Sequence, residues 1–176
     1  RIFTITLKLI AVLSSIFLLF ISIFSSNIVS LIGDSAYSAA QVLIFPLALS
    51  ICIQLITNVT QIGILIEKKP VYYLFCYLLY AIIFTLVFIW LVPYMGLIAI
   101  GWSIVIASLF KAYFVSTLSN KLYKIPWPYF KALIPFIISS FAAFCLSSKE
   151  FIQSNNYYQL TSFLLVSISI VLIFIS

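Results

Sequence analysis

The most unusual residue in this chain that could do chemistry is a lysine inside an apolar segment. Lys111 lies about ten residues before Lys121, which corresponds to roughly 15 Å along a helix. A lysine side chain can extend part of that distance to a membrane surface, but not all of it. Because an ionisable residue inside a membrane span marks a functional site by default, we expect Lys111 to line a cavity and attract an anionic substrate. The alternative is a lysine that reaches the inner leaflet or is satisfied by a carbonyl.

Polar side chains also recur every three or four residues between Gln41 and Pro70. They are Ser50, Gln54, Thr57, Asn58 and Gln61. On a helix they form one stripe, and amides that faced lipid tails would lack hydrogen-bond partners. We therefore take the amides Gln54, Asn58 and Gln61 as candidate substrate-binding residues of a wet cavity. The alternative is hydrogen bonding between helices, at about 0.6 kcal/mol per pair.

A third pattern is an aromatic face on the segment from residue 71 to 92. Its members share one side of a helix and are Tyr73, Tyr77, Tyr80, Phe84 and Phe88. Tyrosine rings can stack on sugars, so Tyr77 is a further candidate for substrate binding. Packing between helices is the competing explanation for the whole face.

Other kinds of site are excluded by what the chain lacks. It has no histidine, and its cysteines lie singly in apolar runs, at Cys52, Cys76 and Cys145. We therefore expect no metal, no cofactor and no catalytic constellation. The acids, Asp34, Glu67 and Glu150, fall at membrane edges or in loops. Because proton- and sodium-coupled carriers usually keep a carboxylate at depth, coupling through an acid would need residues outside this stretch.

Composition places the chain in a membrane. Hydrophobic residues make up 65% of it and charged residues 7%, with a mean hydropathy of +1.31, whereas soluble domains carry about 25% charged residues. The apolar runs are too long and continuous for barrel strands, so we expect an all-α, polytopic integral membrane protein. The net charge of +6 then belongs to cytoplasmic loops and not to a nucleic-acid surface.

Six transmembrane helices are expected, forming a single bundle over residues 1–176. Their approximate bounds are 6–24, 41–66, 71–92, 97–119, 132–148 and 158–176. Residues 25–40 are expected to form a loop and residues 92–96 a tight turn. Pro46 indicates either a kink in the second helix or its interfacial start.

The distribution of basic residues over the loops tests the count of six helices. With residue 1 inside, the cytoplasmic bases are Arg1, Lys68, Lys69, Lys121, Lys124 and Lys131, and Lys149 is outside. This asymmetry agrees with the positive-inside rule. We therefore expect both ends of this segment to be cytoplasmic.

Two stretches resemble a known family. Residues 31–43, LIGDSAYSAAQVL, resemble the junction before a helix in the polysaccharide (O-antigen or capsule) flippases, which belong with the MATE transporters to one exporter superfamily. Residues 91–99, LVPYMGLIA, are similar to that family's turn between two spans, with Ala99 and Ile100 where the family more often has Gly-Ala. The resemblance covers about residues 1–131, and the last two spans in topology alone.

This resemblance implies the C-terminal half of a MATE-like transporter of about twelve helices, built from two bundles. Such a protein moves undecaprenyl-diphosphate-linked oligosaccharide across the bacterial inner membrane by alternating access. Its partners would be membrane lipids, the polyprenyl-diphosphate-linked glycan and the N-terminal half of the same transporter. The first residue is Arg1, which agrees with a fragment of a longer chain. The alternatives are an oligosaccharide polymerase or other membrane glycosyltransferase, and a drug or cation exporter of the same superfamily.

Overall fold

The computed structural model describes residues 2–32, 41–123, 133–134, 136–141 and 143. In this part of the chain the regular structure is helical throughout, as the all-α expectation required. The helices are α1 (Ile2–Ile32), α2 (Gln41–Thr60), α3 (Ile62–Ile66), α4 (Pro70–Met95) and α5 (Ile98–Leu122).

Four helical segments are long and apolar enough to cross a membrane. They are Phe3–Ser25, Val42–Ile66, Pro70–Met95 and Ile98–Leu122, which coincide with the first four expected spans. Residues 133–134, 136–141 and 143 are helical and fall in the fifth expected span, whereas 158–176 lie outside the described residues. The total of six spans therefore remains a prediction.

Two expected helix ends are wrong. The predicted loop at 25–40 is helical up to Ile32, because neither proline nor glycine interrupts the chain before Gly33. The predicted turn at 92–96 is helical up to Met95 with Pro93 inside the last turn. A proline at that point removes a single backbone hydrogen bond at the helix end, and α4 stops at Gly96, whose φ is +56°.

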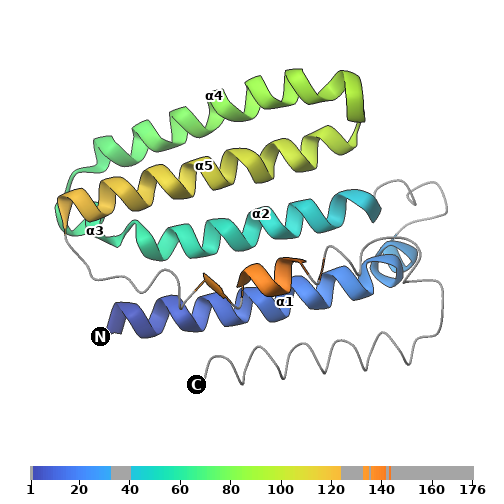
Figure 1. Ribbon diagram of the computed structural model, residues 1–176, viewed down its shortest axis with the longest axis horizontal. Helices are drawn as coiled ribbons and strands as arrows, with labels where there is room; N and C mark the ends of the chain where they lie inside the picture. Colours follow the sequence, from blue (N-terminus) through green and yellow to red (C-terminus); the bar gives the residue numbers. More distant parts are fainter. Residues whose placement is uncertain (1, 33–40, 124–132, 135, 142, 144–176) are drawn as a thin grey trace.

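The long helices lie side by side in one row, in the order α1, α2, α5, α4 (Figure 1). Helix α5 therefore packs on both sides, against α2 and against α4. The short helix α3 lies at the end of the row where α2 stops and α4 starts. The helical residues 133–134, 136–141 and 143 lie along α1 (Figure 1), where Phe136 and Ala143 join the core.

Small residues let α2 and α5 approach closely. A Cβ atom added to Gly101 of α5 would lie 2.7 Å from Cγ of Pro46 in α2. Gly63 of α3 lies even closer to Ser119 of α5, where an added Cβ would meet the hydroxyl Oγ and lie 2.8 Å from the carbonyl oxygen. We call this line of contact, which runs along α2 and continues into α3, the α2–α5 seam. Pro46 lies within α2 and not at its start, with its ring against Gly101.

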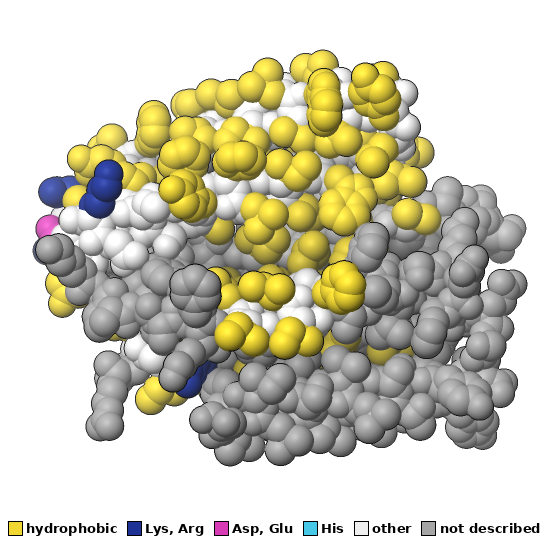
Figure 2. Space-filling model, viewed as in Figure 1, with side chains coloured by type: hydrophobic (Ala, Val, Ile, Leu, Met, Phe, Trp, Pro, Cys, Tyr) yellow, Lys and Arg dark blue, Asp and Glu magenta, His cyan; other side chains and the backbone are white. Residues whose placement is uncertain are grey.

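The surface of the row is largely apolar (Figure 2). Helix α4 contributes most to it, with Leu74, Leu86 and Ile89 all more than 60% exposed. The charged side chains visible in Figure 2 gather toward the end of the molecule where α3 lies, and Glu67, Lys68 and Lys69 are exposed there. This distribution is typical of helices that cross a membrane and end at a polar surface.

Candidate functional site

Lys111 is buried between helices, with 3% of its surface exposed. Its ammonium nitrogen Nζ lies 4.3 Å from the ring centroid of Tyr77 and 5.2 Å from that of Tyr80. Both rings belong to α4, so the lysine of α5 crosses the α4–α5 contact. Each distance falls within the roughly 6 Å over which a cation is attracted to an aromatic face.

The tyrosines are themselves held in place by neighbours on α4. The Tyr73 hydroxyl donates a hydrogen bond of 2.8 Å to the Tyr77 hydroxyl, and the two ring centroids are 4.6 Å apart. The spacing of four residues places successive side chains above one another on a helix. The aromatic face predicted from the sequence is thus the face of α4 that meets Lys111.

The rings take the place that a carboxylate usually occupies beside a buried lysine. The membrane-spanning segments Phe3–Ser25, Val42–Ile66, Pro70–Met95 and Ile98–Leu122 contain no Asp or Glu. Among the described residues the one acid is Glu67, which is exposed beyond α3. A cation–π contact is worth about 0.5–1 kcal/mol when exposed and about 2 kcal/mol or more when desolvated, so the two rings stabilise the ammonium without cancelling its charge.

Two of the candidate amides, Gln54 and Asn58, lie at the same depth as this lysine. Along the seam, α2 and α5 run parallel, and facing residues differ in number by 55 (Pro46 and Gly101) or 56 (Gly63 and Ser119). Lys111 is therefore level with residues 55–56 of the second span, between Gln54 and Asn58.

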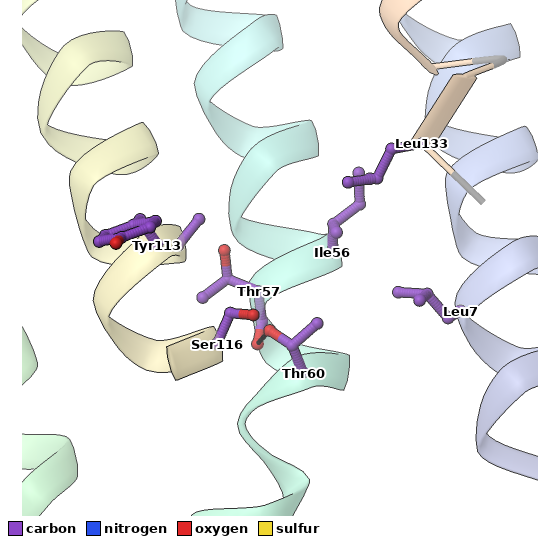
Figure 3. A pocket seen from close by; sticks show the side chains of 8 residues that line it. Leu7, Ile56, Thr57, Thr60, Tyr113, Ser116 and Leu133 are labelled. Atoms are coloured by element: carbon purple, nitrogen blue, oxygen red, sulfur yellow. Dashed lines mark hydrogen bonds between the residues drawn. The ribbon is translucent and has the colours of Figure 1, made fainter. Parts of the chain in front are cut away.

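A cavity of about 190 Å³ opens on one side of the seam (Figure 3). It is lined by Leu7, Ile56, Thr57, Thr60, Ala112, Tyr113, Ser116 and Leu133. The hydroxyls of Thr57 and Thr60 already donate to the carbonyls of Ile53 and Thr57, at 2.7 and 3.0 Å. The cavity is therefore mainly apolar, and none of the predicted site residues lines it.

On α5, Lys111 lies on the side of the seam away from this cavity. Successive residues are about 100° apart around a helix axis. Lys111 is therefore rotated by about 80° from Gly101 around the axis of α5, in one direction. The cavity residues Ser116 and Tyr113 are about 60° and 120° from Gly101 in the other sense.

The rotation angles around the axis of α2 place the amides in the same way. Gln54 and Asn58 lie about 80° and 120° round the helix from Pro46, in one sense. The cavity residues Ile56 and Thr60 lie about 80° and 40° from Pro46 in the other. Both amides are therefore on the side of the seam away from the cavity, as the lysine is.

Exposure differs among the predicted amides. Asn58 is exposed and Gln54 is half-buried. Gln61 is half-buried at the break between α2 and α3, where its carbonyl accepts a hydrogen bond of 2.9 Å from the Ile64 N–H. Since it does not lie within either helix, Gln61 is a less regular member of the stripe than its spacing predicted.

The structure thus brings Lys111 and Tyr77 into contact, and places Gln54 and Asn58 at their depth on the same side of the seam. Sequence reasoning missed Tyr80 as a residue of the site. It also missed that the tyrosine face and the lysine belong together, although both patterns were visible in the sequence. The helix order α2, α5, α4 is the information that joins them.

Compared with protein-family models, curated proteins and solved structures, the chain matches none.

Proposed function

We propose that this chain is part of a membrane transporter of the polysaccharide flippase type, which moves undecaprenyl-diphosphate-linked oligosaccharide across the bacterial inner membrane. The observation that carries the proposal is the burial of Lys111 at membrane depth against ring faces. Such a cation keeps an uncancelled positive charge where an anionic head group would have to pass.

The surroundings of the lysine suit the remainder of the substrate. Gln54 and Asn58 lie at its depth, and amides both donate and accept hydrogen bonds, as a glycan requires. Tyr77 is 38% exposed and offers part of a ring face to a sugar. In this proposal Lys111 binds the diphosphate, the amides and Tyr77 contact the glycan, and the N-terminal half of the transporter contributes the facing wall of the binding site.

The same observations disfavour a cation or drug exporter. A cationic substrate would be repelled by Lys111, and the four described spans contain no acid that could attract it.

The test uses a bacterial strain deleted for the full-length parent protein, with surface polysaccharide as the readout. Wild type should restore polysaccharide, Lys111→Arg should restore part of it, and Lys111→Ala should restore none, at equal abundance in the membrane. If Lys111→Ala restores as much as wild type, Lys111 is not the anion site. If the deletion itself leaves polysaccharide intact, the flippase function is wrong.

A further inference from the structure

The ammonium of Lys111 is covered as well as buried. Its side chain is 3% exposed, and two ring faces lie within 5.2 Å of Nζ. An anion that approached this nitrogen from the side of α4 would have to displace the rings. The arrangement in the structure is therefore a resting position, in which the rings occupy the place that an anionic ligand would take.

The contact between the rings and the ammonium of Lys111 is weak enough for an anionic ligand to replace the rings. A carboxylate beside Lys111 would attract the ammonium by a full Coulomb interaction in a medium of low dielectric constant, and it would compete with an incoming anion. A ring face attracts a cation far more weakly. The rings therefore stabilise the ammonium form of the lysine, and they yield it to a ligand that carries formal negative charge.

The geometry indicates which ring moves. Tyr77 is the nearer ring, at 4.3 Å, and it is 38% exposed, so open space lies beside it. Tyr80 is farther from Nζ, at 5.2 Å, and half-buried. The Tyr73 hydroxyl donates a hydrogen bond to the Tyr77 hydroxyl, so the nearer ring belongs to the same cluster on α4.

We propose that Tyr77 and Tyr80 are positioning residues that hold Lys111 covered at rest and release it to the diphosphate head group of the substrate. The proposal rests on the proposed function, because it assumes that an anion binds at Lys111. It adds that the attraction of the rings, and not their bulk, sets the affinity for that anion.

The test measures binding of undecaprenyl diphosphate to the purified full-length protein in lipid nanodiscs, with undecaprenol as the uncharged control. Tyr77→Leu and Tyr80→Leu keep a bulky apolar side chain but remove the ring face, whereas Tyr77→Phe and Tyr80→Phe keep the face. We expect each Leu variant to bind the diphosphate about 2- to 30-fold more tightly than wild type, which corresponds to the loss of one cation–π contact. Each Phe variant should stay within about twofold, and binding of undecaprenol should not change.

A second series of variants keeps the proposal testable if the Leu variants misfold. Phenylalanines carrying increasing numbers of fluorine atoms at position 77 keep the shape of the ring while weakening its attraction for a cation. Affinity for the diphosphate should rise with each added fluorine, and a flat or falling trend would overturn the proposal.

The outcomes separate the two proposals. If Lys111→Ala abolishes diphosphate binding but the Leu and fluorinated variants bind no more tightly than wild type, the positioning role is wrong and the anion site stands. If Lys111→Ala binds as wild type does, the anion does not bind at Lys111 and both proposals fail at this site.

Discussion

Gly101 and Pro46 touch with no side chain of α5 between them, since a Cβ on Gly101 would lie 2.7 Å from Cγ and 3.1 Å from Cβ of the proline ring. A proline ring is rigid, so it cannot move aside as a long side chain can. This pair, together with Gly63 and Ser119, fixes the register of α2 against α5. The depth of Lys111 relative to the amides depends on that register.

Gly101→Ala should therefore destabilise the protein. We expect a loss of about 1–3 kcal/mol, the usual cost of adding a methyl group to a packed interface, measured as a lower midpoint of thermal unfolding in detergent. Leu109→Ala is the matched control on α5, because Leu109 is 54% exposed and packs little. An equal effect of the two substitutions would contradict the close approach at Gly101.

Gly63→Ala should cost more than Gly101→Ala, because its methyl group would meet the backbone carbonyl of Ser119 as well as the side-chain hydroxyl. Ser119→Ala alone should be nearly neutral, since the buried Oγ has no hydrogen-bond partner in the described structure. The double variant should recover only part of the loss, because the carbonyl contact remains. Full recovery in a double-mutant cycle would show that the hydroxyl alone causes the clash.

Lys111→Met should separate stability from function. Methionine matches the length of lysine and removes the charge that is costly to bury, so the thermal midpoint should stay equal or rise. Polysaccharide export should nevertheless fall to the level of the deletion strain. A variant that loses both stability and export together would indicate that the lysine has a structural role.

Asn58→Leu tests the exposed amide at the depth of the lysine. Because Asn58 is exposed, leucine there should leave abundance in the membrane unchanged, whereas export should decrease severalfold if the amide contacts the glycan. Leu55→Ala is the control, three residues away on the same helix and 44% exposed, and it should export normally. Normal export by Asn58→Leu would remove this residue from the site.

Orientation can be tested with single cysteines. Lys68→Cys should react with a membrane-impermeant maleimide only after the inner membrane is permeabilised, because the positive-inside rule places this exposed residue in the cytoplasm. Leu97→Cys, at 69% exposure beyond the other end of α4, should react in spheroplasts without permeabilisation. Cys52 and Cys76 are buried and should not react with the maleimide, and Cys145 is replaced by Ser. The reverse pattern of labelling would invert the predicted topology.

The sequence by itself determined the class of protein and the first four membrane helices. Continuous apolar runs that end in charged or proline-containing segments leave few alternatives to membrane-spanning helices, since every backbone polar group in a membrane must be paired internally. It also singled out Lys111, because a charge inside an apolar run is conspicuous without any structure. It misplaced the ends of α1 and α4, since a helix continues until something stops it, and neither the polar residues after Ser25 nor Pro93 was sufficient.

The tertiary structure alone decided what surrounds that lysine. Periodicity predicted a tyrosine face on α4 and a polar stripe on α2, but it contains no information on which helices are neighbours. Packing places α5 between α2 and α4, so that Lys111 meets Tyr77 and Tyr80 of α4 and is level with Gln54 and Asn58 of α2. Contacts between residues far apart in the chain depend on how side chains of neighbouring helices fit together, as Gly101 fits Pro46, and that fit cannot be deduced from the spacing of residues along one helix.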